Sequence, residues 1–181
     1  MVERLEKVLN CLSLDFISTA LSSFHCPHQD SESLDVESFL KKHAVDYEKT
    51  GEARTYLLLN DDALSQEQVI IDGYFSIALK TLYFNNEFSR LISESVYGND
   101  SKSRPAYLVA QVGRNENAPK GTGGLLIETA LEYISQASDI VGGRIAYLDC
   151  VPSLRNYYEE KGFNYLQGKH NSGLVQMYRI L

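Results

Sequence analysis

A glycine cluster that opens into a long amphipathic pattern is the feature that most constrains how this chain folds. Residues 118–124 read Ala-Pro-Lys-Gly-Thr-Gly-Gly, and apolar side chains then recur at helical spacing through residues 125–137. The first N–H groups of a helix lack internal partners and carry the positive end of its dipole, so they attract anions. Glycine has no Cβ to block a close approach. The cluster therefore predicts a phosphate-binding turn.

The segments on either side of this helix predict neighbouring parallel strands. Residues 107–112 and 144–150 are rich in aliphatic and aromatic side chains, and they flank the glycine cluster and its helix. A strand, a helix and a second strand in this order form a unit whose two strands lie side by side and run parallel. After it we expect a short helix that Ser153 caps and Gly162 ends, and two closing strands at residues 163–166 and 174–180.

The N-terminal half is predicted to mix helices with antiparallel strands. The patterns favour helices at residues 1–11, 33–49 and 87–96, strands at residues 17–24, 53–59 and 69–79, and a turn at residues 97–100. Gly51 would close the second helix, and Gly73 would mark a bulge. With 181 residues, the chain is expected to be a single domain of mixed α/β class.

The composition limits which binding partners and which cellular compartment we expect for the protein. The net charge of −7 weighs against broad attraction to nucleic acid or anionic membranes, although a local basic groove stays open as an alternative. No apolar run is long enough to span a membrane. Cys11, Cys26 and Cys150 show no paired spacing, and no signal peptide is evident, so we expect a reduced, cytoplasmic location.

Residue order separates this glycine cluster from two common phosphate loops. A nucleoside-triphosphate loop has Gly-Lys followed by Ser or Thr, whereas here Lys120 precedes Gly121. A dinucleotide fingerprint requires a third small residue where this chain has Leu126. Both interpretations are therefore disfavoured.

Two motifs in sequence resemble those of the GCN5-related N-acetyltransferase (GNAT) family. Its loop has Gln or Arg, two residues, Gly, any residue, and Gly or Ala; Gly121 and Gly123 match, and Ala118 stands at the polar position. Residues 156–163, Asn-Tyr-Tyr-Glu-Glu-Lys-Gly-Phe, are similar to the family's aromatic-Tyr-Glu-x-x-Gly-Phe segment. The resemblance is most secure over residues 107–166.

The resemblance implies a GNAT fold, a twisted mixed sheet of about six to seven strands flanked by helices, over residues 1–181. It implies acetyl-CoA as cosubstrate, transfer of acetyl to a primary amine, and no metal. In this family the fourth strand splays from the fifth and pairs with the pantetheine arm, while the loop amides bind pyrophosphate. The residues implied in cofactor binding are Gln111, Val112, Gly113, Lys120, Gly121, Thr122, Gly123, Gly124 and Asn156.

Tyr158 is the candidate proton donor to the departing CoA thiolate. A phenol has a pKa of about 10 and is therefore protonated at neutral pH. Tyr157, about 100° away on the helix, is expected to pack instead. No general base is singled out, since Asp72, Glu94 and Asp149 are equivalent candidates.

The acceptor stays open among several alternatives. A weaker match at residues 33–47, 54–56 and 73–75 is similar to a GNAT branch of toxins from toxin–antitoxin pairs, which acetylate aminoacyl-tRNA, although those proteins are typically basic. The other candidate acceptors are the amines of small molecules, peptides or proteins. A non-catalytic acyl-CoA-binding module is a further alternative, because Ala118 and Val151 stand where the family usually has a polar residue and an Asn. Leu154 also replaces the family's usual Ala. A homodimer is compatible with the fold.

The remaining reactive side chains are expected to be structural. His25, Cys26 and His28 lack the second pair of ligands that a structural zinc site needs. Cys150, on a predicted buried strand, is expected to be an inert core thiol.

Overall fold

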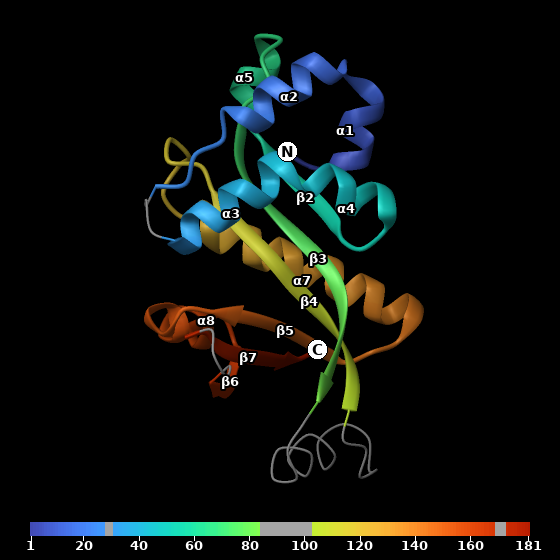
Figure 1. The fold of residues 1–181 in the computed structure, drawn as a ribbon, viewed down its shortest axis with the longest axis vertical. Coiled ribbons are helices and arrows are strands. Elements are labelled where there is room, and N and C mark those ends of the chain that lie inside the picture. The colour runs from blue at the N-terminus through green and yellow to red at the C-terminus, as the bar shows by residue number, and fades with distance from the viewer. Residues whose placement is uncertain (28–30, 84–102, 169–172) are drawn as a thin grey trace. The chain divides into compact units, whose positions relative to one another are not determined.

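The computed structural model of the chain describes residues 1–27, 31–83, 103–168 and 173–181 (Figure 1). These residues form two compact units, one of Met1–Ala78 and Ala110–Ala130, the other of Leu79–Val109 and Leu131–Leu181. The single domain predicted for residues 1–181 stays a prediction, and the predicted helix at 87–96 and turn at 97–100 lie outside the described residues.

Seven strands form one sheet in the order β1-β2-β3-β4-β5-β7-β6. Their bounds are β1 Val2–Arg4, β2 Arg54–Leu59, β3 Ile71–Tyr83, β4 Ser103–Arg114, β5 Ile145–Cys150, β6 Asn164–Gly168 and β7 Val175–Ile180. The pair β4 and β5 is parallel, while β2 with β3 and β5 with β7 are antiparallel. These findings confirm the mixed α/β class, the strand number and the parallel pair around the glycine cluster.

Five helices of the first unit are formed by residues 5–65. They are α1 Leu5–Cys11, α2 Leu14–Ser22, α3 Ser31–Lys42, α4 Ala44–Thr50 and α5 Asp61–Ser65. The helix predicted over residues 33–49 is two helices that break at His43, and Gly51, with φ of 77°, closes the second as predicted. The sequence did not predict α5, which begins where the Asn60 side chain accepts a hydrogen bond from the Ala63 amide.

The strand predicted at residues 17–24 is wrong, because most of this segment belongs to helix α2. Its β-branched and aromatic side chains favoured a strand. The buried positions Ile17, Ala20 and Leu21 are instead three to four residues apart, which places them on one helical face. They join Leu5 and Phe24 in the core of the first unit.

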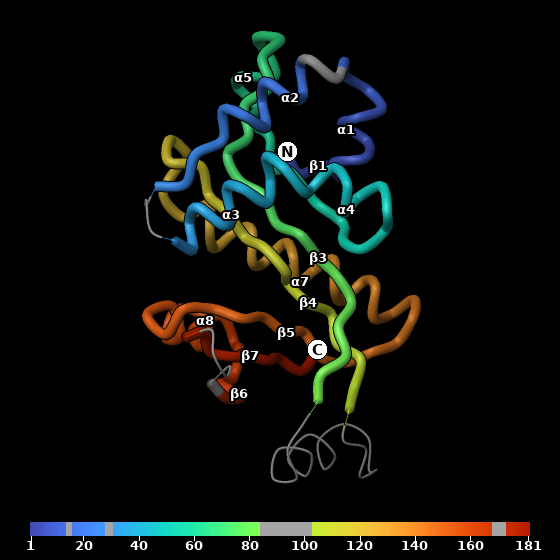
Figure 2. Tube along the Cα trace, viewed as in Figure 1, coloured from blue at the N-terminus to red at the C-terminus, as the bar shows by residue number. Residues whose placement is uncertain are grey.

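The two central strands of the first unit are covered on both sides, by α3 and by the start of α7 (Thr122–Val141) (Figure 2). A Cβ on Gly73 would lie 2.7 Å from Leu126 Cδ1 of α7 and 2.9 Å from the Gly113 carbonyl oxygen. A Cβ on Gly113 would lie 2.7 Å from both Tyr74 Cε1 and Val36 Cγ1. Only glycine fits at either position without displacing a neighbour.

The bulge predicted at Gly73 lies immediately beside it. Leu58 pairs with Gly73, but the next residue of β2, Leu59, pairs with Ile71. Asp72 is therefore the extra residue, and the bulge shifts the register at the start of β3.

The second unit is built around β5, whose residues are almost all buried. Its ladder with β7 runs from Ile145 opposite Ile180 to Cys150 opposite Val175. A 3-10 turn, η2 (Pro152–Leu154), and helix α8 (Arg155–Glu160) follow β5. Ser153 lies inside η2 and does not cap α8 as predicted, whereas Gly162, with φ of 81°, ends the segment as expected. None of the described helices is long and apolar enough to cross a membrane.

The buried phenol of Tyr74 is expected to make the stability of the protein depend on pH. Burial, and secondly the charge of Cys26, raises the pKa of Tyr74 well above its ordinary value, and its hydroxyl donates to the Val36 carbonyl at 2.6 Å. Above pH 10 the unfolded phenol ionises while the folded one keeps its proton. The free energy of unfolding should then fall by up to about 1.4 kcal/mol per pH unit from this group.

Urea unfolding between pH 8 and pH 11 tests this expectation. Tyr74→Phe should make the alkaline decline shallower, at a cost of about 1 kcal/mol at pH 8 for the lost hydrogen bond. Tyr83→Phe is the matched control because its side chain is 76% exposed. Equal slopes in the wild type and in Tyr74→Phe would contradict the assignment.

Candidate functional site

Asn115 fastens the loop between β4 and α7 to the beginning of β3. Its side-chain amide donates to the Ile71 carbonyl at 3.0 Å, and its backbone N–H donates to the Asp72 carbonyl at 2.8 Å. Its Oδ1 accepts from the Asn117 N–H and its carbonyl from the Ala118 N–H, both at 3.1 Å. The residue is only 8% exposed. The side chain and backbone of one residue thus fix where the loop leaves the sheet.

The glycine cluster presents backbone rather than side chain at the start of α7. Gly121 has φ of 96°, and among the described residues other than its chain neighbours, no atom lies within 4 Å of where its Cβ would be. The amides of Gly123 and Gly124 are in the first helical turn, whose N–H groups have no partner within the helix. Thr122 is buried, and both its N–H and its hydroxyl donate to the Pro119 carbonyl. Open space beside polarised amides is what an anion requires.

Two cationic side chains accompany this loop. Lys120 is exposed at the turn before α7. Arg114, the last residue of β4, donates through Nη1 to the Ala118 carbonyl at 3.3 Å. Ala118 itself is buried, so the position that is polar in the resembling family faces the protein here. Arg114 and Asn115 belong to neither motif and were not predicted, although they stand where β4 ends and the loop to the glycine cluster begins.

The end of β4 lies beyond its ladder with β5. In the part of the chain that the structure describes, that ladder joins Tyr107 with Ala146 and Leu108 with Tyr147. Gln111 and Val112 are half-buried, whereas Gly113 is buried and its open side is filled by protein side chains. The close approach expected at Gly113 is therefore made by the protein's own packing. Backbone pairing of these three residues with pantetheine stays a prediction.

Tyr158 lies on α8 in an aromatic cluster. Its ring meets Tyr157 at 5.2 Å and Phe163 at 5.9 Å between centroids, both edge to face. Burial, followed by the charges of Cys150 and Tyr157, raises the pKa of Tyr158, so its phenol keeps its proton. No described residue shares a hydrogen bond with its hydroxyl. Asn156, two residues earlier, is exposed.

Two of the three candidate bases are described, and they have different interaction partners. The carboxylate of Asp72 accepts from the Asn60 side chain at 3.1 and 3.2 Å. Asp149 accepts from the Tyr147 hydroxyl, and its Oδ2 lies 3.6 Å from Lys80 Nζ. Glu94 lies outside the described residues.

The other reactive side chains have structural partners. His25 Nδ1 lies 3.1 Å from Glu37, which also accepts from the Cys26 amide and from Lys41. His28 is not among the described residues, and those residues include no group of three or more metal-ligating side chains. Burial, and then the charge of Asp149, raises the pKa of Cys150 to about 11, which keeps its thiol protonated.

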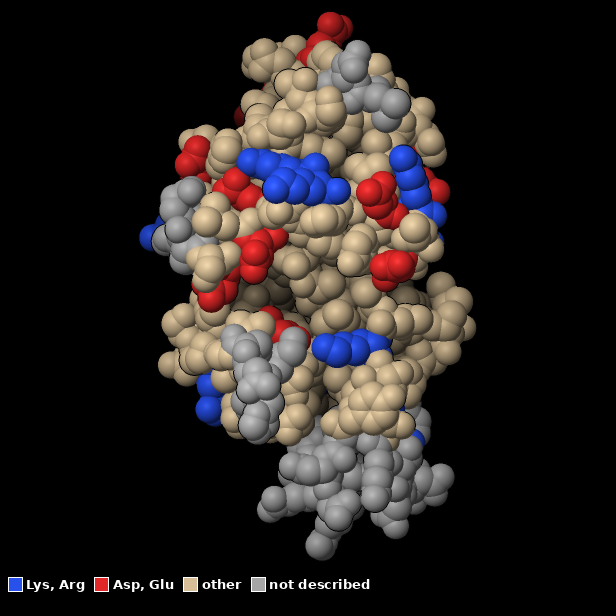
Figure 3. Space-filling view, in the orientation of Figure 1, with Lys and Arg blue, Asp and Glu red and all other residues tan. Residues whose placement is uncertain are grey.

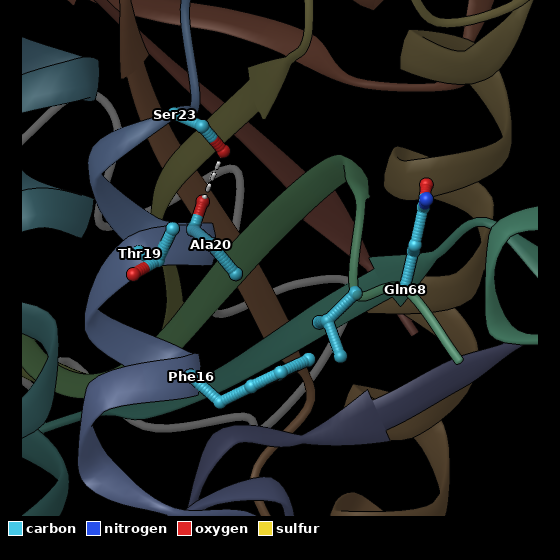
Figure 4. A pocket seen from close by; sticks show the side chains of 6 residues that line it. Phe16, Thr19, Ala20, Ser23 and Gln68 are labelled. Atoms are coloured by element: carbon cyan, nitrogen blue, oxygen red, sulfur yellow. Dashed lines mark hydrogen bonds between the residues drawn. The ribbon is translucent and has the colours of Figure 1, made fainter. Parts of the chain in front are cut away.

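A pocket of about 340 Å³ in the first unit lies between α2 and the residues before β3 (Figure 4). Phe16, Thr19 and Gln68 contribute to its lining, and Ser23 donates to the Ala20 carbonyl at 2.9 Å. None of its lining residues carries a charge or matches a motif residue. The pocket therefore adds nothing to the candidate site.

Asn115→Ala should destabilise the protein by about 1–3 kcal/mol, because it leaves the buried Ile71 carbonyl and the Asn117 amide without their partners. Asn117→Ala changes the same residue type two positions on, at an exposed site, and should stay within about 0.5 kcal/mol of the wild type. Urea unfolding of both variants is the measurement. Similar losses in the two would show that the Asn115 side chain does not anchor the loop.

No protein-family model matches this sequence, and no curated protein sequence matches it. Several solved structures match its fold. A bacterial toxin has 15% sequence identity and a TM-score of 0.74, over 99% of this chain and 90% of that one. A tyrosine-to-phenylalanine mutant of KacT (17% identity) and AtaT complexed with acetyl-methionyl-tRNAfMet (16%) each have a TM-score of 0.72, over 97% of this chain and 92% of theirs. The chain therefore has the GNAT fold that its motifs predicted, the fold of these toxins.

Proposed function

We propose that this protein is an acetyl-CoA-dependent N-acetyltransferase whose acceptor is the α-amino group of an aminoacyl-tRNA. The observation that carries the proposal is the likeness, over 97% of the chain, to AtaT complexed with acetyl-methionyl-tRNAfMet. Another AtaT structure is bound to acetyl-CoA and to the C-terminus of the antitoxin AtaR. By analogy, an antitoxin peptide is a partner we propose for this chain.

The loop before α7 is suited to hold the pyrophosphate of acetyl-CoA. Its first-turn amides lie beside the open space at Gly121, and Lys120 adds an exposed positive charge. Asn115 holds the loop in place without any ligand. In this proposal the missing polar side chain at Ala118 matters little, since the donors are backbone groups.

The reaction requires few protein groups once both substrates are bound. The neutral amine nitrogen attacks the thioester carbonyl, the new C–N bond forms, and the C–S bond breaks to release CoA thiolate. Tyr158 donates its phenolic proton to that thiolate. The acceptor nitrogen loses a proton to water, and water returns a proton to the Tyr158 phenolate, which restores the donor. The raised pKa of Tyr158 keeps this donor loaded at neutral pH.

A second candidate acceptor is a cationic small molecule or peptide amine. The net charge of −7 favours it, because tRNA binding draws strongly on positive charge. On the face shown in Figure 3, Lys and Arg side chains lie among Asp and Glu side chains and form no continuous basic surface over the described residues. An acetylation assay with both kinds of acceptor distinguishes aminoacyl-tRNA from a cationic small molecule or peptide.

Acetyl-CoA should raise the Tm of the protein. At one hundred times its Kd, a ligand that binds only the folded state adds about 2.7 kcal/mol to the free energy of unfolding. Lys120→Glu should raise the Kd about three- to tenfold, because it turns an attraction for phosphate into a repulsion. Lys49→Glu makes the same change at an exposed position in α4 and should leave the Kd unchanged. A flat calorimetric titration of the wild type would overturn the proposal.

Tyr158→Phe should lower kcat by about one hundredfold or more while leaving the Kd of acetyl-CoA unchanged, because it removes only the proton donor. Tyr157→Phe, next to it, should stay within twofold of the wild type. Acetylation is measured with methionyl-tRNA and with a panel of small amines and lysine peptides. Turnover of the panel alone would favour the second acceptor class. Tight binding of acetyl-CoA without any turnover would favour a non-catalytic acyl-CoA-binding module.

A further inference from the structure

A hydrogen-bonded chain of polar side chains crosses three strands of the second unit and ends on a carboxylate. The Gln167 amide of β6 donates to Gln176 Oε1 of β7 at 2.7 Å, and the Gln176 amide donates to the Tyr147 hydroxyl of β5. Tyr147 in turn donates to Asp149 Oδ1. Every donor in the chain points toward Asp149, which accepts the last hydrogen bond.

This chain stabilises a negative charge on Asp149. A hydrogen bond donated to a carboxylate favours its charged form. Tyr147 is fully buried, and burial, followed by its contacts with Asp149, raises the pKa of its phenol, so the proton stays with the donor. The Asp149 side chain is only 16% exposed, and a charge so poorly hydrated needs a cation beside it.

Lys80 of β3 supplies that cation in the described structure. Its ammonium lies 3.6 Å from Asp149 Oδ2 and 4.8 Å from the centre of the Tyr147 ring. The first distance is too long for a hydrogen bond, and the Lys80 side chain is 34% exposed. A carboxylate and an aromatic face thus form a cation site that a loosely held ammonium occupies.

The cation site lies on the strand that leads to the proposed proton donor. Tyr147 and Asp149 point to one face of β5, and Cys150, which influences Tyr158, points to the other because strand side chains alternate. The carboxylate and the phenol therefore belong to opposite faces of the same strand end.

We propose that Asp149 and the face of Tyr147 bind the ammonium form of the acceptor amine, and that Lys80 occupies this site until the acceptor displaces it. The inference rests on the proposed function and names the acceptor class: a primary amine that arrives as a cation, such as an aminoacyl α-ammonium group. It concerns binding before transfer and adds no chemical step.

Steady-state kinetics with L-methionine methyl ester and methionyl-tRNA test the inference. Asp149→Asn keeps the shape of the side chain but loses its charge, so the acceptor KM should rise about tenfold or more. Lys80→Met removes the competing ammonium, so the acceptor KM should fall about two- to fivefold. Asp139→Asn and Lys49→Met, both at exposed positions, should leave it unchanged. Equal acceptor KM values in all four variants would overturn the inference.

Chemical labelling supplies a readout that does not depend on turnover. The ester also consumes acetic anhydride, so the labelling of Lys80 is followed by mass spectrometry relative to that of the exposed Lys49 in the same sample. This ratio should rise severalfold when L-methionine methyl ester is added. In Asp149→Asn it should be high from the outset and insensitive to the ester. No response to the ester in the wild type would overturn the inference, even if acetyl-CoA binds. A flat titration with acetyl-CoA would instead overturn the proposed function alone.

Discussion

The close contact between Gly73 and Gly113 is the constraint on which the first unit depends. Each glycine leaves room for a different neighbour: Leu126 of α7 at Gly73, and Tyr74 with Val36 at Gly113. The two strands are thereby held between helices of both faces at the point where β4 gives way to the loop. The position of the glycine cluster thus depends on two residues without side chains, one in β3 and one at the end of β4.

Local features of the sequence predicted the parts of the fold that local chemistry decides. The glycine cluster and the periodic helix after it identified α7, and Gly51 and Gly162 marked chain reversals that positive φ angles confirm. The segment around Ile17 was misread because residue type favoured a strand while spacing favoured a helix. Tertiary burial of that face against Leu5 and Phe24 decided for the helix.

The residues of the candidate site likewise fall into two groups: those that a motif identifies, and those that only the folded chain brings together. Tyr158 and the loop glycines stand in motifs, so the sequence singled them out. Asn115 acquires its role only because Ile71, 44 residues earlier in the chain, lies within hydrogen-bond distance. Likewise Asp149 was one of three equivalent acids in the sequence. Only the pairing of β5 with β7 brings Gln176 to Tyr147, the residue that donates to Asp149. Such roles depend on strand register and on distant partners, which no short pattern contains.

The anchoring of the loop through Asn115 has a consequence for affinity. A loop that is already fixed in its bound geometry loses little conformational entropy when a ligand arrives, so few contacts suffice for useful binding. When one residue already holds the loop in place, ligand binding depends less on the side chains of the loop and more on that residue. In the proposed acetyl-CoA site, such preorganisation would offset the polar side chain that Ala118 lacks, and it predicts that the loop sequence can diverge more freely than its anchor.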